Sequence, residues 1–292
     1  MSTTLEGKVV LVTGASSGIG RATALALSKS GARVAVGARR TDRLKTLTED
    51  ASGEILPLEL DVTDRQSVND AVAATVEHFG ALDVLVNNAG VMLSSPILGA
   101  DTTEWTRMVE TNLLGSMYMV HAALPHLLGT KGSVVQVSST SGRAASATSS
   151  VYAATKFGIN AFSEALRQEV TAQGVRVVVI EPGFVATELT SHITDPAIQA
   201  AAKSMAESMR TLQPEDIAAA VVYAVTQPEH VAVNEILIRP TRPDEPGAIP
   251  QPGPCRGRAA GRFTDDLTRP RPAPGAAPFP LAIAAPLTAR RP

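Results

Sequence analysis

The sequence contains a tyrosine and a lysine whose spacing could support proton transfer. Tyr152 and Lys156 are four residues apart, so on a helix their side chains lie on one face, one turn apart. A phenol beside an ammonium group is an acid whose anion is stabilised by a fixed positive charge. Chemistry near neutral pH requires the phenol's pKa to fall well below its usual value of about 10. Two unrelated helical residues are the alternative interpretation.

Two further polar residues could act with this pair. Ser139 lies in the segment that leaves the end of an expected strand over 133–137, and its hydroxyl could meet the phenol of Tyr152 over a shared carbonyl group. An ordinary serine-rich loop is the alternative. Asn112 lies inside a helix expected over 101–128, where asparagine is a poor helix former. Its amide could hold a water molecule, or it could be solvated or serve as polar filler.

A glycine-rich turn near the start of the chain predicts a phosphate site. An apolar run over 8–13, the turn over 13–20 and a helical pattern over 21–30 follow one another directly. Strand, glycine-rich turn and helix in this order are typical of dinucleotide binding, because the helix N-terminus stabilises a pyrophosphate. An ordinary flexible turn is the alternative. The residues predicted to bind there are Gly14, Ser16, Ser17, Gly18, Ile19 and Gly20.

Two arginines predict which dinucleotide binds. Arg39 and Arg40 directly follow the expected strand over 33–38, and no acidic residue lies between Arg33 and Thr41. At this place an acidic residue binds the 2′-hydroxyl of the adenosine ribose, whereas an arginine accommodates a 2′-phosphate. We therefore expect Arg39, with help from Arg40, to select NADP over NAD. A solvated arginine pair is the alternative.

The elements that must position these residues alternate between strands and helices. Further strands are expected over 55–60, 82–86, 174–180 and 233–238. Their ends carry the sequences Asp61-Val62, Asn87-Asn88-Ala89-Gly90 and Pro182-Gly183-Phe184-Val185-Ala186-Thr187. Asp61 and Val62 are positioned to contact the edge of an adenine ring, while Asn87 is expected to have a structural role. This alternation predicts an α/β fold with one doubly wound parallel sheet.

Composition excludes several classes of function. The net charge is −2 and the body has no basic block, so neither nucleic acid nor an anionic membrane surface is an expected partner. Cys255 is the only cysteine, which fits a reducing compartment. The sequence shows no charged-then-apolar leader and no apolar run of about 18 residues. We expect a cytoplasmic protein without a metal site.

The last part of the sequence differs from the rest. Residues 243–292 contain 12 prolines, whereas the 242 residues before them contain 8. Such a segment buries too little apolar surface to offset its ordering entropy. We therefore expect a single domain over residues 1–242 and a disordered tail over 243–292.

Taken together, the motifs have the order and spacing of a known family. Thr13-Gly14-x-x-x-Gly18-x-Gly20, Asn87-Asn88-Ala89-Gly90, Asn112, Ser139, Tyr152-x-x-x-Lys156 and Pro182-Gly183 resemble the short-chain dehydrogenase/reductase family over residues 6 to about 241. Within it, the chain is most similar to NADP-dependent aldehyde reductases of the clavulanate type and their 3-hydroxy-acid dehydrogenase relatives. The segments 105–108, 111–115, 154–158 and 235–241 carry this similarity.

This resemblance implies a Rossmann-type sheet ordered 3-2-1-4-5-6-7, an NADP(H) cofactor and a homotetramer or dimer. It implies that Ser139 hydrogen-bonds the substrate carbonyl and that Tyr152 donates the proton. Lys156 would lower the phenol's pKa and hold the nicotinamide ribose, and Asn112 would anchor a water that relays protons to Lys156. The remaining cofactor-binding positions are Arg39, Arg40, Asp61, Val62, Asn88, Ala89, Gly90, Pro182, Gly183, Val185 and Thr187.

Three functions fit these motifs to different degrees. The first is NADP-dependent hydride transfer between the nicotinamide and a small carbonyl or alcohol substrate. The second is a non-catalytic NADP-binding module that acts as a redox sensor or partner subunit, although all four catalytic positions are filled. The third is a sugar-nucleotide epimerase, which would require a larger C-terminal substrate domain.

Overall fold

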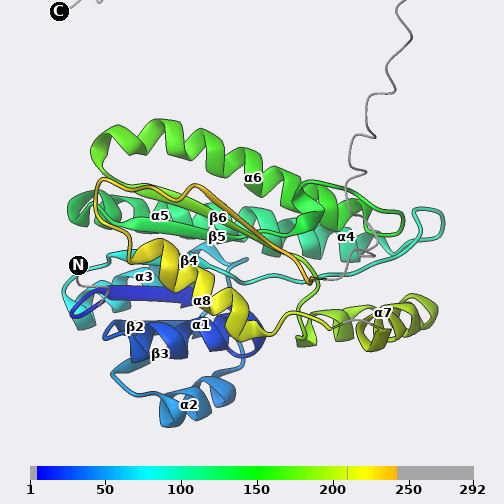
Figure 1. The fold of residues 1–292 in the computed structure, drawn as a ribbon, viewed down its shortest axis with the longest axis horizontal. Coiled ribbons are helices and arrows are strands. Elements are labelled where there is room, and N and C mark those ends of the chain that lie inside the picture. The colour runs from blue at the N-terminus through cyan, green and yellow to red at the C-terminus, as the bar shows by residue number, and fades with distance from the viewer. Residues whose placement is uncertain (1–4, 209, 242–292) are drawn as a thin grey trace, which may run out of the picture. The chain divides into compact units, whose positions relative to one another are not determined.

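The computed structural model describes residues 5–208 and 210–241 (Figure 1). The chain divides into two units, residues 1–249 and 250–292. The tail expected from residue 243 onward, and the domain boundary before it, lie outside the described residues. In the described part, no helix is long and apolar enough to cross a membrane.

Seven parallel strands form one sheet in the order β3-β2-β1-β4-β5-β6-β7, which confirms the predicted fold. The strands are β1 (Val9–Thr13), β2 (Arg33–Ala38), β3 (Ile55–Glu59), β4 (Val84–Asn87), β5 (Ser133–Val137), β6 (Arg176–Pro182) and β7 (Glu235–Ile238). The order reverses between β1 and β4, so the carboxyl ends of these two strands border the crevice where such sheets bind ligands.

Helices cover both faces of the sheet because its strands are apolar on both faces. Val10 and Val12 of β1 pack on one face, and Val9 and Leu11 pack on the other. The first face is covered by α1 (Gly18–Lys29), α2 (Thr41–Asp50) and α8 (Pro214–Val225). The second face is covered by α3 (Arg65–Phe79), α5 (Gly115–Thr130) and α6 (Ser150–Val170). Figure 1 shows α8 lying beside α1.

The expectation of one regular helix over 101–128 was wrong. It consists of α4 (Thr102–Met108), a π-helical turn over Val109–Leu114 and α5. Asn112 lies within this π-helical turn, and its side chain bonds the backbone of Val91 instead of facing solvent. Single π turns are frequent at functional sites because they redirect one side chain without ending the helix.

Other boundaries move by a few residues. The first helix begins at Gly18 rather than at residue 21, so the end of the glycine-rich turn is already helical. The sixth strand runs from Arg176 to Pro182 and therefore includes Glu181. The segment after β6 contains a 3₁₀ turn over Glu188–His192, followed by α7 (Pro196–Ser208).

Candidate active site

A cavity of about 440 Å³ opens at the carboxyl ends of the central strands. Of the predicted site residues, only Gly20 and Asn112 do not line it. Those that do are Gly14, Ser16, Ser17, Gly18, Ile19, Arg39, Arg40, Asp61, Val62, Asn88, Ala89, Gly90, Ser139, Tyr152, Lys156, Pro182, Gly183, Val185 and Thr187. The sequence motifs, which are far apart in the chain, therefore meet in one place.

The glycine-rich turn is shaped by close packing. Gly14 has φ +66°, and a Cβ added to it would lie 2.7 Å from the Cα of Ala89. A Cβ on Gly20 would lie 2.5 Å from the carbonyl oxygen of Gly14. Gly20 therefore packs α1 against the turn, and it does not line the cavity.

The N-terminus of α1 is open to an anion. Ser17 is the N-cap residue, yet its side chain makes no capping hydrogen bond, and the first turn contains no acidic residue. The first N–H groups of a helix have no intrahelical partner and carry partial positive charge. This end of α1 therefore fits a phosphate group.

Asn88 and Thr13 hold the turn in place. The Asn88 Nδ2 atom donates to the carbonyl oxygens of Thr13 at 3.0 Å and Gly14 at 3.2 Å. The Thr13 hydroxyl accepts hydrogen bonds from the backbone N–H groups of Asn88 and Ala89, both at 3.0 Å. The Asn88 side chain thus supports the floor of the cavity, so it shapes the predicted cofactor site from below.

The two arginines, which both line the cavity, differ in what their side chains contact. Arg40 donates from Nε and Nη2 to the Ser16 hydroxyl at 3.1 and 2.9 Å, and from Nη2 to the Ser17 hydroxyl at 2.9 Å. Arg39 has a side chain that is 61% exposed and lies 3.9 Å from a carboxylate oxygen of Asp61. Arg40 is therefore the arginine fixed at the phosphate turn, because neighbouring side chains leave an extended chain in opposite directions.

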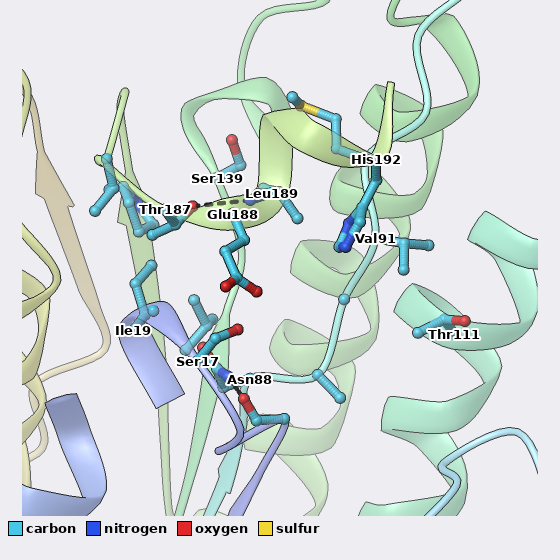
Figure 2. Close-up of a pocket in the computed structure, with 18 of the residues that line it drawn as sticks. Ser17, Ile19, Asn88, Val91, Thr111, Ser139, Thr187, Glu188, Leu189 and His192 are labelled. Atoms are coloured by element: carbon cyan, nitrogen blue, oxygen red, sulfur yellow. Dashed lines mark hydrogen bonds between the residues drawn. The ribbon is translucent and has the colours of Figure 1, made fainter. Parts of the chain in front are cut away.

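Glu188 is a site residue that sequence reasoning missed. Its carboxylate accepts hydrogen bonds from Arg40 at 3.0 Å and from Arg43 at 2.8 and 2.9 Å. Figure 2 shows this carboxylate pointing into the cavity toward Ser17. The Arg43 and Arg40 guanidinium groups lower the pKa of Glu188. Only the fold reveals this pairing, because the arginines precede Glu188 by more than 140 positions.

The segment after β6 crosses the cavity near α1. A Cβ added to Gly18 would lie 3.1 Å from the Cγ2 atom of Thr187, and the Thr187 hydroxyl accepts from the Leu189 N–H at 3.3 Å. Figure 2 shows Thr187, Glu188 and Leu189 on one stretch of chain above Ser17 and Ile19. This stretch therefore covers the phosphate turn.

Ser139, Tyr152 and Lys156 come together in the cavity. Tyr152 and Lys156 lie on α6 and are 5% and 7% exposed. The Lys156 ammonium donates to the Val137 carbonyl at 2.9 Å and lies 5.7 Å from the centre of the Tyr152 ring. The Ser139 hydroxyl, at the end of β5, accepts from the Ser141 N–H at 3.0 Å. The expected serine–tyrosine–lysine grouping is present.

The pKa values differ from the sequence expectation. Burial raises the pKa of Tyr152 to about 12, and a hydrogen bond with Ser139 opposes this rise. Burial also lowers the pKa of Lys156 to about 8. Burial sets the direction of the shift at Tyr152, because it removes the water that would stabilise a phenolate. Tyr152 is therefore protonated at neutral pH and can donate a proton.

Asn112 connects two parts of the site without lining the cavity. Its side chain accepts from the Val91 N–H at 2.8 Å and donates to the Val91 carbonyl at 2.9 Å and the Thr155 hydroxyl at 3.2 Å. It thus ties the loop after β4 to α6. These bonds use both N–H groups of the amide and leave a second lone pair on its oxygen, and the predicted role of Asn112 in anchoring a water stays a prediction.

His192 is a second residue that sequence reasoning missed. It lines the cavity, and Figure 2 shows its ring beside Val91. Its Nδ1 atom is buried and has no hydrogen-bond partner within residues 5–208 and 210–241. Burial lowers the pKa of His192, and the charges of Arg107, Arg40 and Arg39 add to this effect. The imidazole is therefore neutral at neutral pH.

Comparisons with known proteins agree with this geometry. The family model described as short chain dehydrogenase matches residues 8–197. A glycine betaine reductase of Emericella nidulans is 45% identical over 248 residues, which cover 83% of this chain and 19% of that protein. An uncharacterized oxidoreductase of Staphylococcus saprophyticus is 36% identical and is covered over 97% of its length, against 81% of this chain. This chain thus spans about a fifth of the Emericella protein and nearly all of the staphylococcal one.

Two solved structures extend the comparison. An alcohol dehydrogenase from the archaeon Thermococcus sibiricus, complexed with 5-hydroxy-NADP, has a TM-score of 0.71 and 31% identity, covering 81% of this chain and 99% of that one. A closed serine dehydrogenase complexed with NADP+ has a TM-score of 0.75 and 33% identity, covering 79% and 94%. The motif order, the sheet and the matched residues lead to one conclusion: this chain belongs to the short-chain dehydrogenase/reductase family, whose members use a nicotinamide cofactor.

Proposed function

We propose that this chain is an NADP-dependent oxidoreductase that transfers a hydride between the nicotinamide and a small carbonyl or alcohol substrate. The observation that carries the proposal is that Ser139, Tyr152 and Lys156 line the same cavity as the glycine-rich turn. A proton donor and a phosphate site in one cavity are what reduction by a nicotinamide dinucleotide requires.

The cavity residues fit NADP. The turn from Gly14 to Ile19 and the open N-terminus of α1 would hold the pyrophosphate. Arg40, held by Ser16 and Ser17, would bind the 2′-phosphate, and the NADP complexes of similar structures support this choice. The other proposed contacts are Arg39, Asp61 and Val62 at the adenosine, Ala89 and Gly90 below the cofactor, and Pro182, Gly183, Val185 and Thr187 at the nicotinamide.

The proposed chemistry follows from the protonation states. When bound, the cofactor supplies or accepts the hydride. The Ser139 hydroxyl hydrogen-bonds the substrate carbonyl, and the protonated phenol of Tyr152 donates its proton to the carbonyl oxygen. The Lys156 ammonium, 5.7 Å from the ring centre, stabilises the phenolate left behind.

A scan of aldehydes and ketones for NADPH oxidation tests this proposal. The set should include an aldehyde with a quaternary ammonium group, because one relative is named a glycine betaine reductase. Tyr152→Phe should lower kcat by at least ~100-fold while NADPH binding persists, because only the proton donor is lost. Near-normal turnover by Tyr152→Phe would refute the assignment of the acid.

Binding of NADPH without turnover of any scanned compound would favour the non-catalytic module instead. The epimerase alternative would require conversion of a sugar nucleotide without net NADPH consumption. A homotetramer or dimer and a cytoplasmic location also stay predictions, and light scattering of the purified protein measures the first of them.

A further inference from the structure

Glu181 is a buried carboxylate that the proposed reaction does not use. It is the last residue before Pro182 in β6, and it is 1% exposed. Its register partner in β7 is Leu237. A carboxylate in this position loses its hydration and must be compensated by hydrogen bonds and opposite charge.

Both carboxylate oxygens of Glu181 are engaged by residues from other elements. Oε2 accepts from Arg143 Nε at 2.6 Å and lies 2.5 Å from Arg143 Nη2. Oε1 accepts from Asn160 Nδ2 at 2.8 Å. On its outer side, Arg143 also contacts Glu235. The carboxylate therefore joins one residue that follows β5 to another on α6.

These two partners belong to the segments that carry the proposed catalytic groups. Arg143 follows the 3₁₀ turn Thr140–Gly142, whose N-cap residue is Ser139. Asn160 lies on α6 one turn beyond Lys156, and its Nδ2 atom also donates to the Gly142 carbonyl at 3.2 Å. The Ser139 loop is thus attached to the Tyr152–Lys156 helix through groups that Glu181 holds.

The loop and the helix are packed without spare room. A Cβ added to Gly142 would lie 2.8 Å from Asn160 Nδ2 and 3.0 Å from the carbonyl oxygen of Lys156. The loop therefore rests directly on the helix backbone. A shift of Arg143 or Asn160 would move the Ser139 hydroxyl relative to the Tyr152 phenol.

We propose that Glu181 is a positioning residue: through Arg143 and Asn160 it fixes the Ser139 loop against α6, and so sets the position of the Ser139 hydroxyl relative to the Tyr152 phenol. This proposal rests on the proposed function, because it assumes that Ser139 and Tyr152 act together on a carbonyl group. The carboxylate touches neither of them, so its effect on the reaction is transmitted through the loop.

Glu181→Gln tests this role, because it keeps the shape of the side chain and removes its charge. Misplacement by about 1 Å can cost roughly 100-fold in rate, so we expect kcat to fall by about 10- to 100-fold. The NADPH dissociation constant should change by less than about twofold, because the phosphate contacts are untouched, and kcat should change more than KM does. A purely structural role would lower the melting temperature and leave kcat per folded molecule unchanged, which would overturn the proposal.

Glu235→Gln is the matched control. Glu235 contacts the same arginine from outside, and its side chain is 52% exposed. We expect kcat within about twofold of the unaltered chain, because exposed ion pairs contribute little. A loss of kcat as large as that of Glu181→Gln would show that either ion-pair partner of Arg143 has this effect and that the buried carboxylate has no special role, and would overturn the proposal.

A second measurement does not depend on turnover. The N–H groups of Gly142 and Arg143 bond the carbonyls of Ser139 and Thr140 at 2.9 and 3.0 Å. In the full chain, Glu181→Gln should speed hydrogen exchange in a peptide over 139–144 by about tenfold, and Glu235→Gln should not. Unchanged exchange would overturn the proposal even if no substrate is found. Failure of the unaltered chain to reduce any carbonyl compound would instead refute the proposed function alone.

A third variant covers the case in which Glu181→Gln does not fold. Arg143→Lys keeps the positive charge but loses the two-point contact with Oε2, and the Arg143 side chain is 34% exposed. We expect a fall in kcat of about 3- to 30-fold with the NADPH dissociation constant unchanged. Unchanged kcat in this variant would overturn the proposal.

Discussion

Replacing Lys156 by methionine removes a buried positive charge as well as a hydrogen bond. At neutral pH the variant should therefore be more stable than the loss of the hydrogen bond alone predicts. Lys156 is 7% exposed, and burial lowers its pKa from 10.5 to about 8. The folded chain therefore binds this proton less tightly than the unfolded chain does. Keeping the ammonium charged below pH 8 costs the fold about 3 kcal/mol, because each pKa unit corresponds to about 1.4 kcal/mol.

The pH dependence separates this cost from other effects. The cost is fully present below the folded pKa of about 8, and it fades as the pH rises toward 10.5. Between about pH 7 and 9.5, the unfolding free energy of the unaltered chain should rise relative to Lys156→Met by about 2 kcal/mol. The variant also leaves the Val137 carbonyl without its donor, which costs about 1–3 kcal/mol at every pH.

Urea unfolding of the cofactor-free protein at several pH values measures this difference. Lys45→Met is the matched control, because Lys45 is exposed on α2 and its loss should leave the pH dependence unchanged. The unfolding free energies of the unaltered chain and of Lys156→Met could instead differ by the same amount from about pH 7 to 9.5. That result would show that burial does not destabilise the charged form of Lys156, and would refute the reasoning.

The remaining predictions concern the cofactor and the tail. Arg40→Ala should weaken NADPH binding by about 10- to 100-fold more than NADH binding, because a charge-assisted phosphate contact contributes about 1.5–3 kcal/mol. Arg39→Ala should reduce the preference for NADPH over NADH by less than Arg40→Ala does, and fluorescence titration with both cofactors compares the two variants. A larger loss of preference in Arg39→Ala would favour the expectation from sequence that Arg39 selects NADP. Glu188→Gln should tighten NADPH binding by about 2- to 5-fold, because it releases Arg40 from a half-exposed ion pair. Weaker NADPH binding in the same titration would mean that the carboxylate assists the cofactor. Truncation after Arg242 should leave kcat/KM, melting temperature and oligomer mass unchanged, since the described sheet and cavity are complete before it; a melting temperature several degrees lower, or loss of turnover, would show that the tail is structural.

The sequence predicted the strands and the residues at their ends well, for a physical reason. The strands are short β-branched runs buried on both faces, and this pattern is local. In a parallel sheet the carboxyl ends of the strands meet at one edge, so Ser139, Gly90 and Gly183 were expected to lie together once the strands were assigned.

The features that could not be predicted from the sequence depend on residues far apart in the chain. A shift of one position along the chain decides whether an arginine after β2 faces the glycine-rich turn or solvent. Arg40 rather than Arg39 faces the turn. Burial, which raises the pKa of the Tyr152 phenol, cannot be read from a four-residue spacing. The carboxylate of Glu181 finds Arg143 38 positions earlier in the chain, so its role becomes visible only in three dimensions.

The pairing of Glu188 with Arg40 and Arg43 has a consequence for how the cofactor site responds to ionic strength. The three side chains are 41–45% exposed, so dissolved salt screens these ion pairs. For the proposed cofactor, the 2′-phosphate and this carboxylate compete for one guanidinium. Added salt weakens the attraction of Arg40 for the phosphate, but it also weakens the competing ion pair between Arg40 and Glu188. NADP affinity should therefore depend less steeply on salt than the charge of the phosphate alone implies, and the internal carboxylate acts as a counterion that the chain carries with it.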